Sequence, residues 1–184
     1  MPLSFDMPFE DLVQYQGINP KPDDFDAYWT KALEDMRSVD PALELVPADF
    51  QADGCDCFHL YFNGVGGARM HAKYLRPNRV KEAYPALLLF HGYTGSSRDW
   101  MDKLAYVSQG FSVAALDCRG QGGLSEDLSL VSGNTHHGHI IRGLSDALAG
   151  APEKLLYRQI FLDTAQLANI VMNMPEVDAT RVGA

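Results

Sequence analysis

The sequence predicts an α/β fold in which a doubly wound, mostly parallel sheet follows a set of antiparallel N-terminal strands. Two continuous apolar runs, residues 84–91 and 111–117, have the composition of strands that are covered on both faces, as in a parallel sheet. A helical pattern near residues 98–109 separates the two runs and ends at Gly110. Because strand, helix and strand in this order favour a right-handed crossover, we expect the two strands to be parallel neighbours.

The chain before the expected sheet divides into an arm and a helix. Residues 1–22 are rich in proline and predict an irregular arm. Residues 23–38 predict a helix, which Asp23 or Asp24 can cap at its start. The apolar side chains of this segment recur at helical spacing on one face: Phe25, Trp29, Ala32, Leu33 and Met36.

Residues 43–76 change to the period of β-strands. The segments LELVPADF, CDCFHLYFN and ARMHAKYLRP predict three strands, and NGVGG between the last two supplies Asn and Gly for a tight reversal. We expect these strands to form an antiparallel opening to the sheet. For His59 and His71, which each lie in a strand, a packed or surface position is favoured over a catalytic one.

The last part of the chain predicts a long helix and a third parallel strand. Residues 152–174 show an apolar stripe over 23 positions, with Pro152 in the first turn and Pro175 after the end. The segment RVGA at residues 181–184 has the composition of a buried strand. Residues 43–184 are therefore expected to hold the sheet and its crossover helices, in a single domain.

Composition and charge exclude several classes of partner. Apolar residues make up 46% of the 184 positions and charged residues 21%, as in an ordinary globular domain. The net charge of −9 argues against nucleic acid and against an anionic membrane surface. Because the N-terminus lacks the basic and apolar regions of a secretory signal, we expect a cytoplasmic protein.

No metal or other cofactor is expected from the sequence. Cys55 and Cys57 form half of a metal-binding pattern, but no second half is present. The cluster of His136, His137 and His139 lies in a segment rich in Gly and Ser, without the carboxylate or Cys that would complete a site, so a solvated loop is favoured.

Two glycine-rich loops follow the apolar strands, and ligands of parallel sheets bind beyond the carboxyl ends of the strands. In HGYTGSS, residues 91–97, His91 and Gly92 let the chain turn so that the amide of Tyr93 can face the crevice. Acyl-transfer enzymes use such amides to bind the oxyanion of the tetrahedral intermediate. An ordinary strand-to-helix turn has the same local sequence, so both interpretations remain open on this loop alone.

The second loop, DCRGQGGLS, offers no convincing nucleophile. Cys118 lies at the mouth of the expected crevice, but no neighbouring base is evident, and Arg119 alone does not make a catalytic pair. Asp117 could orient a histidine, although its place at the end of a strand favours a role in capping the backbone.

The segments LLLFHGYTGSSRDW, FSVAALDCRGQGG, IIRGL and DATRVGA resemble the acetyl xylan esterase and cephalosporin C deacetylase family, which belongs to carbohydrate esterase family seven. The opening PDDFDAYW is also similar to that family, so the resemblance covers nearly the whole chain. It implies an α/β-hydrolase fold, a serine esterase that deacetylates small sugars and cephalosporin C-like esters, and a ring-shaped hexamer. The Arg119-Gly120-Gln121 triplet is the most specific part of the match.

The resemblance implies particular roles for the loop residues. The backbone amide of Tyr93 is expected to form half of the oxyanion hole. Arg119, Gly120 and Gln121, together with His91 and Gly92, are expected to support the site without breaking bonds themselves.

The nucleophile is the main departure from the family. A serine hydrolase of this fold carries its nucleophile in G-x-S-x-G after a strand, with the acid and His further along the chain. The segments around Ser125 and Ser145 lack the second Gly, so no catalytic residue is assigned here. We therefore expect an N-terminal part of one α/β-hydrolase domain, truncated before the nucleophile elbow and completed by the remainder of the same protein. The alternative is a non-catalytic binding or assembly subunit on a truncated hydrolase framework.

Overall fold

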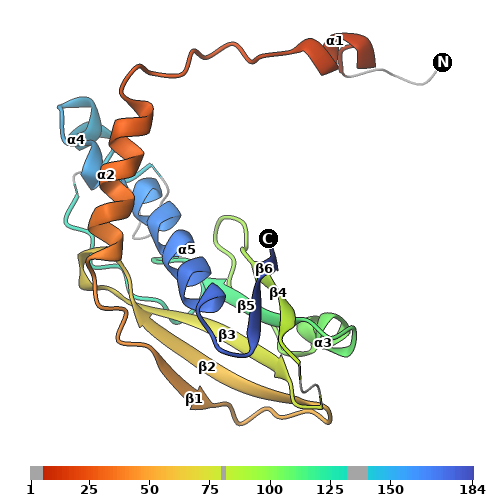
Figure 1. The fold of residues 1–184 in the computed structure, drawn as a ribbon. Coiled ribbons are helices and arrows are strands. Elements are labelled where there is room, and N and C mark those ends of the chain that lie inside the picture. The colour runs from red at the N-terminus through yellow and green to blue at the C-terminus, as the bar shows by residue number, and fades with distance from the viewer. Residues whose placement is uncertain (1–5, 80–81, 132–140) are drawn as a thin grey trace. The chain divides into compact units, whose positions relative to one another are not determined.

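A computed structural model describes residues 6–79, 82–131 and 141–184 (Figure 1). The chain divides into two compact units, residues 1–31 and 32–184, and each is considered by itself. The histidine cluster at residues 136–139 lies outside the described residues. Within the described ranges, every helix is too short or too polar to cross a bilayer.

The N-terminal arm is not wholly irregular, which corrects the prediction for residues 1–22. Helix α1 spans Phe9–Gln14 and follows Pro8, whose carbonyl oxygen accepts hydrogen bonds from the N–H groups of Asp11 and Leu12. Proline is compatible with the start of a helix, and acidic residues in the first turn complement the helix dipole. The helix predicted over residues 23–38 is confirmed as α2, Phe25–Arg37.

The predicted antiparallel strands are confirmed as β1 (Glu44–Pro47), β2 (Cys55–Asn63) and β3 (Arg69–Pro77). β2 pairs with both β1 and β3 in antiparallel register. The reversal between β2 and β3 contains the short 3₁₀ helix η1, Val65–Gly67, where Gly66 and Gly67 adopt positive φ. These two glycines therefore adopt a backbone conformation that other residues rarely adopt.

The parallel part of the sheet also agrees with the prediction. β4 (Tyr84–Leu89) and β5 (Ser112–Asp117) are parallel neighbours joined through α3, Met101–Ser108. β6, Val177–Gly183, pairs in parallel with the other side of β4. The strand order is β1-β2-β3-β5-β4-β6, so β3 and β5 form the antiparallel junction between the two halves of the sheet.

The long helix predicted over residues 152–174 is shorter than expected. Pro152 begins a separate 3₁₀ turn, η2 (Pro152–Lys154), and α5 runs over Leu156–Met172. Leu155 between them is extended, with φ −64° and ψ 119°, and the N–H of Leu156 donates to the carbonyl of Arg142 instead of continuing a helix. A further short helix, α4 (Leu144–Leu148), was not predicted.

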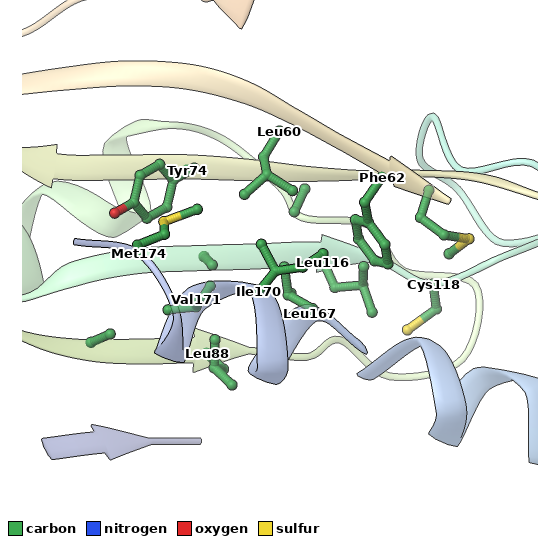
Figure 2. Packing of buried hydrophobic residues seen from close by; sticks show 14 of the residues in the cluster. Leu60, Phe62, Tyr74, Leu88, Leu116, Cys118, Leu167, Ile170, Val171 and Met174 are labelled. Atoms are coloured by element: carbon green, nitrogen blue, oxygen red, sulfur yellow. The ribbon is translucent and has the colours of Figure 1, made fainter. Parts of the chain in front are cut away.

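Helices cover both faces of the sheet. On one face, α5 packs Leu167, Ile170 and Val171 against sheet residues such as Tyr74 and Leu116 (Figure 2). On the other face, α3 packs Val107 against a second apolar cluster that includes Leu75 and Val113. Every residue of β5 is buried, as expected for a central strand with both faces covered. The loops at its C-terminal end consequently stand on a rigid support.

Candidate active site

Two loops meet at the C-terminal ends of β4 and β5, where ligands of parallel sheets bind. The first contains residues 90–97 and the second contains residues 118–125. The N–H of Gly122 donates to the carbonyl of Gly95 at 2.9 Å, and the N–H of Cys118 donates to Nε2 of His91 at 3.0 Å. The two loops are therefore bound directly to each other at the edge of the sheet.

His91 holds the first loop through both of its ring nitrogens. Because Nε2 accepts from Cys118, the neutral ring carries its hydrogen on Nδ1, which donates to the carbonyl of Gly92 at 2.8 Å. The ring also leaves no room for a side chain at Gly95, where a Cβ atom would lie 2.8 Å from Nδ1. His91 thus acts as a brace for the main chain of the turn.

Gln121 holds the next residue of the same loop. Its Oε1 accepts a hydrogen bond of 2.7 Å from the N–H of Thr94, which has φ 60° in the left-handed region. A non-glycine residue in that region carries conformational strain. Gln121 therefore stabilises the peptide immediately after Tyr93.

The two glycines named from the sequence differ in their steric role. Gly120 has φ 67° and adopts a left-handed conformation that favours glycine. A Cβ atom at Gly92 would meet nothing within 4 Å among the described residues, and its φ is not positive. The turn therefore does not depend on glycine at position 92, although a side chain there would project into the space beside the loop.

Tyr93 borders a cavity of about 280 Å³. The residue is 55% exposed. The other lining residues come from both loops and from α5, and most are apolar or aromatic: Phe90, His91, Gly92, Cys118, Gln121, Tyr157, Ile160, Phe161 and Thr164. The cavity is large enough for a small ester, and its walls suit an apolar acyl group more than a charged one.

Arg119 is not among the residues that line this cavity and is buried, with 1% of its surface exposed. Its guanidinium donates to both carboxylate oxygens of Asp163 on α5, at 2.6 and 2.7 Å. It also donates to Gln159 at 2.6 Å and to the carbonyl of Val65 at 2.9 Å. Arg119 consequently joins the end of β5, helix α5 and the β2–β3 reversal.

Asp163 and Gln159 were not identified from the sequence. Burial raises the pKa of Asp163 to about 6, while the hydrogen bonds and charge of Arg119 act in the opposite direction. One signal was available, because Asp163 interrupts the apolar stripe of α5 between Ile160 and Leu167. A carboxylate on a buried helix face requires a partner, although the sequence does not say which.

Asp117, at the end of β5, is also shared between the two loops. Its carboxylate accepts hydrogen bonds from the N–H of Ser97 at 2.5 Å and from the N–H of Leu124 at 3.0 Å. Burial alone would raise the pKa of this carboxyl, but hydrogen bonds from His71, Leu124 and Ser97 outweigh it and hold the pKa well below its usual range. The backbone-capping role favoured from the sequence agrees with this geometry, and the bond to His71 adds an imidazole contact.

Cys57 and Cys118 do not have the character of nucleophiles. Burial, with the nearby charges of Asp163 and Asp117, raises the pKa of Cys118 to about 11. Burial and the neighbouring Cys55 raise the pKa of Cys57 to about 12. A thiol with so high a pKa is almost wholly protonated near neutral pH and reacts slowly. In the part of the chain that the structure describes, no group of three metal-ligating side chains comes together.

Comparison with known proteins identifies close relatives of this fold. The chain is 57% identical to acetyl xylan esterase 1 from Thermoanaerobacterium sp. JW/SL YS485, with a TM-score of 0.89 over 97% of this chain and 55% of the relative. It is 26% identical to an acetyl xylan esterase from Paenibacillus sp. R4, with a TM-score of 0.84 over 96% of this chain and 55% of that one. The chain thus spans about half the length of these solved relatives.

These matches confirm the α/β-hydrolase fold expected from the sequence. The family model for acetyl xylan esterase (AXE1) matches residues 1–184. The chain that carries the buried Arg119 and the two glycine-rich loops therefore belongs to the acetyl xylan esterase family.

Proposed function

We propose that this chain is the N-terminal portion of a serine esterase that removes acetyl groups from small acetylated sugars such as xylo-oligosaccharides. The observation that carries the proposal is the family match over residues 1–184. The geometry supports it, because the loop containing Tyr93 is fixed by side chains and borders a cavity of suitable size. Carboxylic ester hydrolysis is the chemistry that such a loop serves in this fold.

Within this function, the backbone N–H of Tyr93 is one donor of the oxyanion hole. An oxyanion donor stabilises the transition state only if it is already in place when the charge develops. His91 and Gln121 supply that preorganisation, since they hold the residues on either side of the Tyr93 amide. Arg119 and Gly120 support the second loop, and no side chain of the described residues is assigned a bond-breaking role.

The nucleophile, acid and base belong to a portion of the esterase beyond this sequence. The support is twofold: the sequence holds no G-x-S-x-G segment, and the chain spans 55% of the solved relatives. Ser125, one of the serines considered from the sequence, donates its hydroxyl to the carbonyl of Asp117 and is therefore occupied in holding the loop.

Finer features of the function follow from the family resemblance. Cephalosporin C-like esters are a second substrate class, because they also present a small acetyl group. The complete enzyme is a hexamer whose active sites face an inner cavity, which admits small acetylated sugars and excludes polymers. Its location is cytoplasmic, and neither a metal nor another cofactor takes part.

The test compares two proteins, the natural full-length product that includes this chain and purified residues 1–184 of confirmed intact mass. Full-length protein is expected to hydrolyse p-nitrophenyl acetate and acetylated xylo-oligosaccharides, and a serine-directed inhibitor should block it. Residues 1–184 alone are expected to show no turnover above background, since triad chemistry needs three groups that they lack.

Two outcomes would contradict the proposal. An inhibitor-sensitive burst and steady turnover by residues 1–184 would reveal a nucleophile within this sequence. A natural product that ends at Ala184 and is stable but inert would favour the non-catalytic subunit instead.

A further inference from the structure

A chain of three side chains connects the surface of the sheet to the two active-site loops. His71 on β3 lies beside Asp117 on β5, and the two residues are paired in the antiparallel register. Nδ1 of His71 is 2.6 Å from Oδ2 of Asp117, and both side chains are almost fully buried. On the other side of His71, its Nε2 is 2.8 Å from Nδ1 of His59 on β2.

The hydrogen positions in this chain follow from the carboxylate. Ionised Asp117 can only accept, so Nδ1 of His71 carries a hydrogen, and in the neutral ring Nε2 is then an acceptor. Where the His71 ring is neutral, His59 therefore donates from its own Nδ1. Burial, with the nearby His71 and Lys73, lowers the pKa of His59, whereas Asp49 and Asp117 oppose this change. This lowered pKa favours the neutral ring of His59, which can donate to Nε2 of His71.

The carboxylate at the inner end holds main chain from both loops. Oδ1 accepts from Ser97, and Oδ2 accepts from Leu124 as well as from His71. Contact with the second loop is tight, since a Cβ atom at Gly123 would lie 2.0 Å from Cγ of Asp117. A small rotation of this carboxylate would therefore displace both loops together.

We propose that His71, oriented by His59, is a positioning residue of the esterase: it fixes the Asp117 carboxylate and thereby fixes the two loops that frame the site. The inference rests on the proposed function for its effect on catalysis. His71 touches no substrate and acts through Asp117. Without His71, the buried Oδ2 atom would lose one of its donors and keep that from Leu124, and the loop carrying the Tyr93 amide would lose precision.

The test uses the full-length protein with four single variants. We call the hydrogen-bonded chain His59–His71–Asp117 the relay. His71→Leu removes both of its hydrogen bonds, whereas His71→Asn keeps a donor close to the position of Nδ1. His59→Leu removes only the outer link. Tyr61→Phe is the matched control, because Tyr61 pairs with His71 in the strand register and stacks on His59 but lies outside these hydrogen bonds.

Two measurements are made on each protein. Amide hydrogen exchange at Ser97 and Leu124 reports the loops directly and needs no activity. Steady-state kinetics with p-nitrophenyl acetate give kcat and KM, which report the effect on catalysis and on substrate binding. For His71→Leu we expect exchange at both amides to be about tenfold faster and kcat about tenfold lower, with KM changed less than about twofold, because alignment is lost while binding contacts remain.

His71→Asn should return the exchange rates and kcat most of the way to their wild-type values. Tyr61→Phe should match the wild type in both. If His71→Leu does not fold, His59→Leu tests the same hydrogen bonds, because it removes the one at the half-buried end. It should also make amide exchange at Ser97 and Leu124 faster. Unchanged exchange at both amides in the leucine variants would overturn the proposal.

The two measurements also separate this proposal from the proposed function. Faster exchange with rescue by His71→Asn, in a protein that hydrolyses no ester, would support the relay and contradict the esterase. An active wild type whose leucine variants keep both kcat and exchange would support the esterase and contradict the relay.

Discussion

Arg119 and Asp163 form an ion pair in which each side chain exposes 1% of its surface. Removing one partner of such a pair leaves a buried charge without compensation, which costs far more than the pair itself contributes. Asp163→Ala should therefore lower the free energy of unfolding by about 3–5 kcal/mol. Replacing both partners, Arg119→Met with Asp163→Leu, should cost less than Asp163→Ala alone. Urea unfolding of the full-length wild type and of these two variants measures the differences in the free energy of unfolding.

Arg79 provides the control for that experiment, because its ion pair with Asp53 is exposed at the surface. Arg79→Ala should leave the unfolding midpoint essentially unchanged. Equal losses from Asp163→Ala and Arg79→Ala would show that burial of the Arg119 pair has no energetic consequence.

Tyr93 offers a second prediction at the scale of one residue, since its proposed role belongs to the backbone N–H. Tyr93→Phe should keep most of the esterase activity. Tyr93→Pro removes the donor and should lose about 3 kcal/mol of transition-state stabilisation, roughly 100-fold in kcat. Circular dichroism and the unfolding midpoint establish whether the proline variant is folded. Full activity in a folded Tyr93→Pro protein would disprove the assignment.

At the scale of elements, the reversal between β2 and β3 is packed against the Arg119 pair. Gly64 has φ −87° and ψ 179°, which any residue can adopt, so its backbone does not require glycine. A Cβ atom there would lie 2.3 Å from Oδ1 of Asp163 and 2.8 Å from Cγ of Met70. Gly64→Ala should therefore destabilise the protein by about 1–3 kcal/mol through overpacking. An unchanged urea midpoint would mean that the ion pair can shift at no cost.

Elements with a strong local pattern were predicted well. β2 was predicted at the residues where it occurs, because alternation and the Asn-Gly reversal are local signals. The start of α5 was wrong for a non-local reason, since Leu156 bonds to Arg142 and Leu155 becomes extended. The apolar stripe continues through this break, so periodicity alone could not reveal it.

The same distinction applies to the site. His91, Gly92 and Tyr93 were named because they lie in a short glycine-rich segment after a predicted strand, and Gln121 was named because its triplet resembles the family motif. Asp163 was not named, and His71 was expected only as a packed or surface histidine, because the two residues stand 44 and 46 residues from the groups that they bind. Only the folded sheet brings such pairs together, and a lone buried charge in the sequence does not identify its counterpart.

At the scale of the whole molecule, Asp117 gives the fold a specific response to acid. Its pKa is held below the usual range, so the folded state binds its proton later than the unfolded state as pH falls. The resulting stability is present above about pH 4, the ordinary range for Asp, and is lost as pH falls below it.

Asp117→Asn should therefore be less stable than the wild type at pH 7, and the difference should shrink between about pH 4 and pH 2. Urea midpoints measured from pH 7 to pH 2 provide the comparison. Parallel curves for the two proteins would show that the carboxylate is not the group responsible.

The bonds between the two loops have a consequence for how this family can change. Most of the groups held at the site are peptide N–H groups, from Thr94, Ser97, Cys118 and Leu124, and the atoms that receive them belong to His91, Asp117 and Gln121. Every residue except proline has that N–H, so these four hydrogen bonds do not depend on which side chain the donating residue carries. The exposed side chain at position 93, which borders the cavity, can thus change while three receiving side chains keep the two loops in place.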